Sequence, residues 1–359
     1  MKQLYFTPGP SETYFTLQDH MRSAIKSDIP SISHRSKAFS AMYQETAQRL
    51  KDLMDIPDDY YIFFASSATE IWERMLQNCV ERRSLHLVNG AFSKRFFNIA
   101  QSLGIEAIKY EAALGRGITP NEIDPDPEVE LLAITHNETS TGVAQPLEHI
   151  SILRQKFPKA IVAVDMVSSA PYVALDFSQV DAAYFSVQKC FGLPAGLGVW
   201  ILNQRCIEKA KEKQSKGQFI GSYHSLPAYL EKYKKFQTPE TPNVLAIYLL
   251  ERVAQDMLNR GLDVIRKETE FKSGLLYYYF QQSNLFQPFV KEKEWRSKTV
   301  IVADSLKPSE EVIGFLKAKG VTVGAGYGEM RSRQIRIANF PTHSKEQIQS
   351  LVDQLSAFK

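Results

Sequence analysis

The stretch AIVAVDMVSS, at residues 160–169, indicates the fold class. Five apolar residues run without interruption up to Asp165, and continuous apolar strands of this kind are typical of a sheet that is buried on both faces. Similar short runs alternate with amphipathic runs through the first half of the chain. This alternation predicts βαβ units, and therefore a mostly parallel sheet with helices on both faces. We expect strands at residues 61–65, 85–88, 131–135, 160–164, 182–185 and 199–202, and helices at residues 69–82, 93–103 and 147–157.

The pattern changes after about residue 203. A lysine-rich helix and a loop rich in glycine and proline come first, and two long helices are expected at residues 244–258 and 263–282. The remaining residues alternate strand and helix, which predicts a small α+β domain. A chain of 359 residues is long enough for two domains. We predict an N-terminal arm at residues 1–15, a large domain at residues 16–258 and a small C-terminal domain at residues 259–359.

The composition excludes several classes of protein. Hydrophobic residues make up 44% of the chain and charged residues 23%, as in ordinary globular proteins. The formal net charge is +3, so we expect no surface for nucleic acid or an anionic membrane. The N-terminus lacks a signal-peptide pattern, and no apolar run approaches the roughly 18 residues of a membrane helix. Three cysteines at this spacing form neither a disulfide framework nor a zinc site, so we predict a soluble cytoplasmic protein without a metal.

Polar segments follow several predicted strands, at the sheet edge where ligands bind in open α/β folds. In residues 65–70 (ASSATE), small side chains lie between a strand and the start of a helix. Backbone N–H groups there can bind a phosphate, although the same pattern fits an ordinary helix N-cap. Asp165 leaves a buried strand and needs a metal, a cation or a protonated ring nitrogen as partner, unless it caps a turn. A metal is the weakest option because no histidine pair lies nearby at ligand spacing.

Lys189 also follows an apolar strand, and a glycine-rich turn comes after it. Lysine is normally exposed, and partial burial lowers its pKa and makes the neutral amine a nucleophile that can form a Schiff base. The alternative is a surface lysine of which only the stem is buried. Residues 137–142 (NETSTG) follow the strand at residues 131–135, and they either hydrogen-bond a ligand or make an ordinary turn. Each segment alone is a weak signal.

The order of these segments resembles that of one enzyme family. The small-residue turn is followed by an aromatic residue after Asn89-Gly90, by N-E-T-x-x-G, by the strand-end aspartate and, 24 residues later, by the lysine. This arrangement is similar to that of the pyridoxal-phosphate enzymes of the aspartate-aminotransferase fold, in the class V branch. The resemblance covers nearly the whole chain and extends to residues 7–10 (TPGP), 33–39 (SHRSKAF), 55–60 (DIPDDY), 240–242 (ETP) and 336–339 (RIAN).

The resemblance implies the fold, the cofactor and the assembly. The expected fold is PLP fold type I, with a three-layer α/β/α large domain, a mostly parallel sheet and a small C-terminal α+β domain. The implied cofactor is pyridoxal 5′-phosphate. The implied partners are small amino acids and 2-oxo acids, together with a second copy of the chain in a homodimer with shared active sites.

The resemblance also implies roles for residues of the cofactor site. Lys189 is implied to bond the cofactor and then to move a proton between substrate and cofactor. Asp165 is implied to hold the pyridine nitrogen protonated, so that the ring accepts electrons. Phe92 is implied to stack on the ring, where the family usually has tryptophan, and Thr139 to lie beside its phenolic oxygen. The residues implied to bind the cofactor phosphate are Ala68, Thr69 and Gln188, together with Thr241 of the neighbouring chain.

For the substrate, the resemblance implies that Arg336 binds the carboxylate, a task that the planar guanidinium suits. His34 and Arg35 are implied to bind a distal phosphate, because residues 33–39 and 55–60 are most similar to phosphoserine aminotransferases. The implied reaction interconverts O-phospho-L-serine and 2-oxoglutarate with 3-phosphonooxypyruvate and L-glutamate, as in serine biosynthesis.

Three departures from that pattern leave an alternative open. The phosphate turn reads SSA at residues 66–68 instead of GGA, and residues 240–243 read ETPN instead of NTPP. Glu329 and Met330 stand where the phosphoserine enzymes carry a second His-Arg pair, although arginines lie close by at positions 331 and 333. The alternative is a serine- or alanine–glyoxylate type of class V aminotransferase, which acts on an unphosphorylated small amino acid.

Two further classes are not expected. A cysteine desulfurase needs a reactive cysteine on a C-terminal loop, and no cysteine follows Cys206. A non-catalytic regulator that only binds the cofactor has no need for a carboxylate-binding arginine at position 336.

Overall fold

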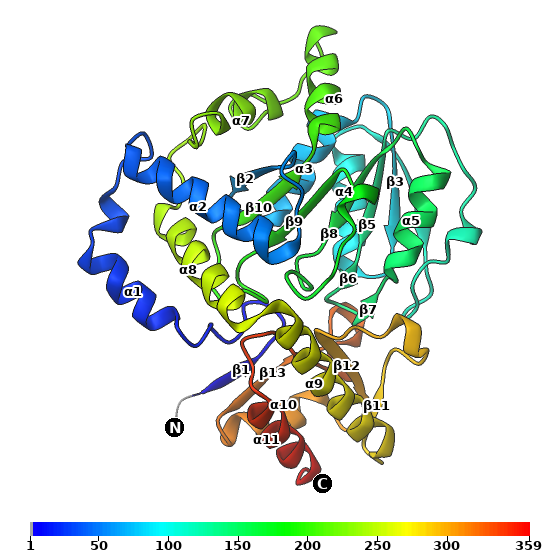
Figure 1. The fold of residues 1–359 in the computed structure, drawn as a ribbon. Helices are drawn as coiled ribbons and strands as arrows, with labels where there is room; N and C mark the ends of the chain where they lie inside the picture. Colours follow the sequence, from blue (N-terminus) through cyan, green and yellow to red (C-terminus); the bar gives the residue numbers. More distant parts are fainter. Residues whose placement is uncertain (1–2) are drawn as a thin grey trace.

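The structure is a computed structural model that describes residues 3–359. Its centre is a seven-stranded sheet, in which β10 runs antiparallel to both of its neighbours and every other neighbouring pair is parallel. All six strands expected in the first part of the chain belong to this sheet, which confirms the mostly parallel α/β prediction. In spatial order they are β2 (Tyr61–Ala65), β10 (Gly198–Leu202), β9 (Ala182–Ser186), β8 (Ile161–Asp165), β5 (Leu131–Thr135), β3 (Arg83–Val88) and β4 (Glu106–Glu111) (Figure 1).

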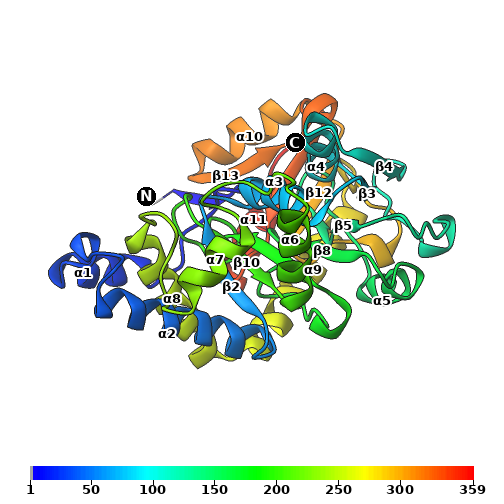
Figure 2. The ribbon, with the colours of Figure 1, turned by 90° about the horizontal axis from the view of Figure 1, so that it is seen from above.

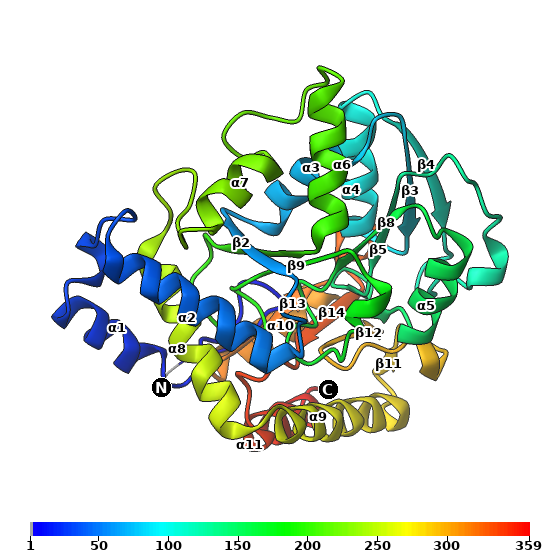
Figure 3. The same ribbon diagram turned by 45° about the horizontal axis from the view of Figure 1, so that its top comes forward.

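Helices cover both faces of this sheet because alternate strand residues point to opposite sides and both sets are apolar. In β2, Ile62 and Phe64 belong to the core on one face, whereas Phe63 and Ala65 belong to the core on the other. The result is the predicted three-layer arrangement (Figure 3). The first face is covered by α1 (Leu17–Lys26), α2 (Lys37–Met54), α5 (Leu147–Lys156) and α8 (Val244–Arg260), and the second by α3 (Ala68–Cys79), α4 (Ala91–Ser102), α6 (Gln204–Ser215) and α7 (Leu226–Tyr233).

A second sheet of five strands lies at one end of the first (Figure 1). Its first strand comes from the N-terminal segment and pairs in parallel with β13, beside which it lies in Figure 2. With the proposed boundaries at residues 15 and 258, the N-terminal arm therefore adds one strand to the sheet of the small domain. In order, the elements are β1 (Leu4–Phe6), β13 (Val321–Ala325), β14 (Gln334–Ala338), β12 (Val300–Ser305) and β11 (Phe286–Pro288), with α9 (Leu262–Gln282), α10 (Ser309–Ala318) and α11 (Lys345–Ser356) packed against them.

The other face of the second sheet meets the first sheet at the carboxyl ends of β8 and β9. Cys190, just after β9, packs there with side chains of β12 and β14. A hairpin of β6 (Asn137–Glu138) and β7 (Val143–Ala144) lies at the same junction, where Val143 bridges to Arg296. The junction therefore brings the strand ends, the N-E-T run and the second sheet together. Short 3-10 helices complete the chain: η1 (Ile29–Ser31), η2 (Pro120–Glu122), η3 (Phe177–Gln179), η4 (Lys293–Trp295) and η5 (Gly328–Met330).

The sequence did not predict the strands β4 and β13, and there is a physical reason in each case. β4 lies at the edge of the large sheet with most of its residues partly or fully exposed, so it carries no continuous apolar run. β13 combines alternating burial with a glycine at position 324, which weakens a strand pattern. All three cysteines are buried and unpaired. Within residues 3–359, no helix combines the length and the hydropathy needed to cross a membrane.

Candidate active site

Asp165 lies at the floor of the junction as the last residue of β8, with only 3% of its surface exposed. One carboxylate oxygen accepts the Val167 amide (2.9 Å), and the other accepts the indole N–H of Trp72 (3.1 Å). Burial raises the pKa of Asp165 to about 6, while these hydrogen bonds and the nearby Lys189 favour the ionised form. At neutral pH this position therefore suits a cationic partner such as a protonated ring nitrogen.

The Lys189 side chain is buried at the same junction, so the interpretation as a surface lysine is wrong. Its Nζ donates a hydrogen bond to Thr139 Oγ1 at 2.7 Å. Burial lowers the pKa of Lys189 to about 8, although Asp165 and Glu138 favour the charged form. Gly9, from the TPGP run, packs on the lysine stem with φ +127°, and a Cβ there would lie 2.8 Å from Lys189 Cε. The N-terminal segment thus forms one wall of the lysine site.

A directed chain of hydrogen bonds continues from Thr139. The Thr139 hydroxyl donates to Ser168 Oγ (3.0 Å), Asn137 Nδ2 donates to the same oxygen (2.8 Å), and Ser168 Oγ donates to the Asn137 carbonyl (2.9 Å). All three residues are buried. Because the Thr139 proton is directed at Ser168, its oxygen is left to accept from Lys189. The N-E-T run therefore does more than form a turn.

Phe92 lies in the first turn of α4, with its ring centroid 5.1 Å from Lys189 Nζ. The start of this helix is held by Glu138, which is completely buried and accepts the amides of Phe92 (3.3 Å) and Ser93 (2.9 Å). Gly90 makes room for the carboxylate, since a Cβ there would lie 2.3 Å from Glu138 Cγ. An acidic side chain from the β6–β7 hairpin thus caps α4 and orients Phe92.

Arg336 reaches the junction from β14 of the second sheet. Its Nε donates to the Ala325 carbonyl (2.7 Å) and its Nη1 donates to the Thr139 carbonyl (3.2 Å). The guanidinium lies 5.4 Å from the ring centroid of Tyr327, which in turn lies 5.5 Å from that of Phe92. Arg336, Phe92 and Lys189 are therefore brought together around Thr139.

The start of α3 has features of an anion site. Ser67 caps the helix by accepting the Glu70 amide (3.1 Å), and the Ala68 amide donates to Ser186 Oγ (2.9 Å). Within residues 3–359, the Thr69 amide has no acceptor. Gln188 is half-buried and precedes Lys189. A free amide in the first turn of a helix fits the cofactor phosphate that the sequence resemblance implies.

Three of the predicted residues form a separate group. Arg35 donates to the backbone oxygens of residues 238–239 (2.8 and 3.2 Å), two residues before the exposed Thr241. His34 lies beside Arg35, and burial and that guanidinium lower its pKa, while Glu240 acts in the opposite direction. Within one chain, these residues therefore group with the segment 238–241, and their hydrogen bonds do not lead to Lys189.

A cavity of ≈390 Å³ opens beside Tyr327, between the start of α4 and η5. Glu329 and Met330 line this cavity. Among the described residues, the lining includes neither Arg331 nor Arg333. Both arginines are exposed, and the guanidinium of Arg333 contacts Met330 Sδ at 3.8 Å. The cavity wall next to the site therefore carries the acidic Glu329 at the position where the sequence resemblance to phosphoserine aminotransferases implies a His-Arg pair.

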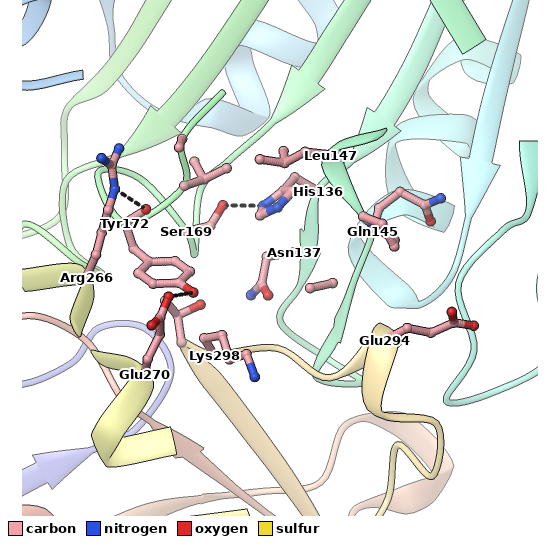
Figure 4. A pocket seen from close by; sticks show the side chains of 15 residues that line it. His136, Asn137, Gln145, Leu147, Ser169, Tyr172, Arg266, Glu270, Glu294 and Lys298 are labelled. Carbon is pink, nitrogen blue, oxygen red and sulfur yellow. Dashed lines mark hydrogen bonds between the residues drawn. The ribbon is translucent and has the colours of Figure 1, made fainter. Parts of the chain in front are cut away.

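Another cavity, of ≈270 Å³, is lined by both strands of the β6–β7 hairpin, by the loop after β8 and by α9 (Figure 4). His136 contacts Ser169 Oγ at 2.8 Å on one wall, and burial lowers its pKa to about 4, so the ring is neutral. On the opposite wall, Arg266 donates to the Tyr172 carbonyl (3.1 Å). Asn137 belongs to both this cavity and the hydrogen-bond chain that ends at Lys189.

Several functional candidates escaped the sequence reasoning. Trp72 gave no signal, because an aromatic residue at helical spacing fits a hydrophobic core as well as a polar contact. Glu138 and Ser168 belong to runs that the sequence did single out, although their own contacts could not be assigned. The residues that the structure adds around the predicted site are Trp72, Glu138, Ser168, Ser186 and Tyr327.

Comparison with known proteins agrees with this geometry. Residues 7–335 match the family model described as Aminotransferase class-V. A phosphoserine aminotransferase from Rhodococcus opacus is 29% identical over 353 residues, which cover 96% of this chain and 92% of the relative. The crystal structure of a phosphoserine aminotransferase from Cytophaga hutchinsonii is similar over 99% of this chain and 98% of its own, with 50% identity and a TM-score of 0.97.

The fold is also shared with more distant proteins. An alanine–glyoxylate aminotransferase from a Nostoc species has a TM-score of 0.86 at 24% identity, covering 99% of this chain and 95% of its own, which is a likeness of fold alone. The family model spans most of the chain, and the strand-end aspartate and lysine predicted from the sequence lie within its range. The chain therefore belongs to the class V aminotransferases, a family of pyridoxal-phosphate-dependent transaminases.

Proposed function

We propose that this protein is a phosphoserine aminotransferase, which interconverts O-phospho-L-serine and 2-oxoglutarate with 3-phosphonooxypyruvate and L-glutamate. One observation carries the transaminase chemistry: a buried amine, carboxylate and guanidinium from three separate elements converge, with Lys189 and Arg336 both bonded to Thr139. The choice of phosphoserine is supported by the 50% identity with the Cytophaga enzyme and by the run at residues 33–39.

The site fits pyridoxal 5′-phosphate. When bound, this cofactor supplies a conjugated ring that takes up the electrons left on the substrate Cα after its proton is removed. Asp165 would face the ring nitrogen and keep it protonated, while Phe92 would cover the ring and Thr139 would lie at the phenolic oxygen. The residues proposed to hold the phosphate are Ala68, Thr69 and Gln188, at the start of α3 and beside Lys189.

Lys189 is the proposed acid and base of the reaction. With a pKa lowered to about 8, a useful fraction of the amine is neutral near pH 7.5, so it can accept the proton from the substrate Cα and return it. Arg336 is the proposed ligand of the substrate carboxylate. Its Nε and Nη1 are engaged with backbone oxygens, which fixes the plane of the guanidinium and leaves Nη2 for the carboxylate.

We further propose a homodimer with shared active sites. Thr241, His34 and Arg35 form one group on the chain, and a second copy would place that group in the neighbouring site, on the cofactor phosphate and on the distal phosphate of the substrate. The three buried, unpaired cysteines suit a reducing compartment, and we propose the cytoplasm.

The acidic cavity wall supports one alternative. Glu329 would lie near a substrate phosphate, and two negative groups in a partly buried site repel each other. An unphosphorylated small amino acid, with glyoxylate or pyruvate as acceptor, meets no such repulsion. The alternative function is therefore that of a serine- or alanine–glyoxylate type of aminotransferase.

Rapid mixing of the loaded enzyme with single donors tests the proposal, with loss of the visible absorbance of bound cofactor as readout. We expect kcat/KM for O-phospho-L-serine to exceed that for L-serine and L-alanine at least about tenfold, since each charge-assisted hydrogen bond contributes ~1.5–3 kcal/mol. Arg35→Ala should remove most of this preference, whereas Arg22→Ala, at an exposed arginine of α1, should keep it. A wild-type preference for serine or alanine, or an equal loss for all donors in Arg35→Ala, would establish the alternative.

A further inference from the structure

A histidine between two carboxylates lies next to the phosphate-binding start of α3. His224 Nδ1 contacts Glu70, and its Nε2 contacts Glu240 Oε2 at 2.9 Å. The histidine side chain is only 7% exposed, and the rings of Tyr223 and Tyr229 pack on it at centroid distances of 4.1 and 5.2 Å. We call His224, Glu70 and Glu240 the imidazole bridge.

The geometry requires that the ring carry two protons. A neutral imidazole has one N–H group, so one of its nitrogens would turn a lone pair toward a carboxylate oxygen. Only the imidazolium donates to both partners, and this gives two charge-assisted hydrogen bonds in a largely buried place. Burial alone disfavours the charged ring, but the bonds to Glu240 and Glu70 outweigh it and raise the pKa of His224 to about 9. The same bridge helps to lower the pKa of Glu70 to about 2 despite its burial.

The imidazole bridge joins two parts of the chain that are proposed to bind cofactor phosphate. Glu70 is in the first turn of α3 and accepts the amide (2.9 Å) and hydroxyl (2.6 Å) of Ser66, so it holds the turn that leads to Thr69. Glu240 immediately precedes Thr241, and its carbonyl accepts from the Thr238 hydroxyl (2.7 Å). His224 contacts both of these carboxylates.

We propose that His224 is a positioning residue, which pins the segment 238–241, proposed to serve the neighbouring subunit's cofactor, to the start of α3, proposed to serve its own, and thereby sets how tightly the cofactor phosphate is held. Glu240 directly precedes Thr241, so its carboxylate lies on the segment that is proposed to bind phosphate. An unpaired carboxylate beside a phosphate site would repel the phosphate, and the imidazolium removes that repulsion while it fixes the loop. The proposal rests on the cofactor part of the proposed function and is independent of the amino donor.

The pH dependence follows from the groups that face the ring. The carboxylates of Glu70 and Glu240 are the only ones in contact with it among the described residues, and Arg74 lies 3.7 Å from Glu70. The pKa of His224 is higher in the folded protein than in the unfolded chain, so its stabilising effect is complete below about pH 6.5 and is lost as the pH rises through about 9. The remaining titratable groups around the imidazole bridge are Tyr223, Tyr229, Tyr43, His34 and Arg35.

The test compares pyridoxal phosphate with pyridoxal, which lacks the phosphate, as ligands of the cofactor-free full-length protein. Both are titrated by quenching of tryptophan fluorescence in wild type, His224→Gln, Glu240→Gln and His20→Gln. His20 is the matched control, because it contacts Asp256 at 2.6 Å on α8, in a separate imidazole–carboxylate pair. We expect His224→Gln to weaken pyridoxal phosphate at least about tenfold and to leave pyridoxal and the control unchanged. In wild type, the dissociation constant of pyridoxal divided by that of pyridoxal phosphate should fall as the pH rises past about 9. In His224→Gln this ratio should not change with pH.

The outcomes separate the possible failures. If the ratio of the two dissociation constants is the same in His224→Gln as in wild type, the positioning role is overturned. An equal loss of affinity for both ligands also overturns it, because such a loss indicates general damage to the fold. Glu240→Gln covers the case in which His224→Gln does not fold, because it keeps the shape of the side chain. Its loss of charge is expected to weaken the hold on the loop without unfolding the protein. An unchanged ratio of dissociation constants in Glu240→Gln also overturns the proposal. If wild type binds neither ligand, the proposed cofactor itself is wrong.

Discussion

At the residue scale, burial at strand ends gives Asp165 and Lys189 their chemistry. The strand pattern of the sequence predicts that both leave the same sheet edge, and their shifted pKa values follow from the loss of water around each. The contacts that tune these values come from elsewhere in the chain. Trp72, which donates to Asp165, is 93 residues away in sequence.

The first prediction concerns that indole. Trp72→Phe keeps an aromatic ring but removes the N–H donor to the Asp165 carboxylate, so the pKa of Asp165 should rise further above about 6. The acid limb of the pH profile of kcat should therefore move to higher pH, and kcat at pH 7 should fall by about tenfold or more, since one buried hydrogen bond to a charged group is worth ~1.5–3 kcal/mol. Trp200→Phe is the control, because its indole contacts Met75 Sδ at 3.2 Å in the core. An acid limb that stays in place in Trp72→Phe contradicts the role of the indole.

A second prediction concerns the cost of the buried Lys189 ammonium in the cofactor-free protein. Its pKa of about 8 is lower than that of a lysine in the unfolded chain, so the unfolded state binds more protons and the stability rises with pH between the two values. Lys189→Met should abolish transamination and raise the free energy of unfolding at pH 7 by ~2 kcal/mol, with a smaller gain at pH 10. Urea unfolding at both pH values measures this.

Lys272→Met is the contrasting control for that experiment. Lys272 is also buried, and burial lowers its pKa to about 7, but its Nζ donates to two backbone carbonyls, those of Phe340 (3.0 Å) and His343 (2.7 Å). Its replacement should leave these oxygens without a donor and should lower the stability. A loss of stability at pH 7 in Lys189→Met would refute the cost ascribed to the buried ammonium.

At the scale of single elements, α4 depends on a cap that comes from another part of the chain. The sequence predicts a helix at residues 93–103, and the structure has it at Ala91–Ser102. The first residue, Ala91, follows a glycine that cannot cap by a side chain, and Glu138 supplies the carboxylate from the β6–β7 hairpin. This arrangement ties the orientation of Phe92, which is proposed to stack on the cofactor ring, to the N-E-T run beside Lys189.

A third prediction tests that cap. Glu138→Gln keeps the shape but places an amide N–H₂ against N–H and O–H donors, so the free energy of unfolding should fall by ~2 kcal/mol. The KM for the donor should rise as well, because Phe92 loses its fixed direction. Urea unfolding and steady-state kinetics measure the two effects. Glu148→Gln, an exposed acidic residue in the first turn of α5, should change neither quantity, and a Glu138→Gln variant as stable as wild type would contradict the cap.

At the scale of the whole molecule, the two sheets meet so that one chain supplies the lysine, the aspartate and the arginine that is proposed to bind the substrate carboxylate. The group of His34, Arg35 and Thr241 lies apart from them, on the segment 238–241. A second copy of the chain would complete the site, so the protein should be a dimer in light scattering.

The last prediction is complementation between two impaired subunits. Lys189→Ala lacks the residue proposed to transfer the proton, and Arg35→Ala lacks a residue proposed to act in the neighbouring site. In a mixed dimer, one site then holds Lys189 of one subunit and Arg35 of the other, so mixing the two variants should restore activity toward phosphoserine. Mixing two batches of the same variant is the control. A stable, active monomer, or no recovery in mixed dimers whose formation is verified, would contradict shared sites.

The sequence by itself determined the alternation of strands and helices, the parallel sheet and the edge at which Asp165 and Lys189 lie. These follow from hydrophobic period and chain order, which are local properties. Only the tertiary structure decided which side chains meet there. Glu138 contacts the start of α4 across 45 residues, Trp72 contacts Asp165 across 93, and Arg35 contacts the segment before Thr241 across 203. Such contacts depend on how the layers pack, and no pattern along the chain encodes the distance between two elements once they are folded.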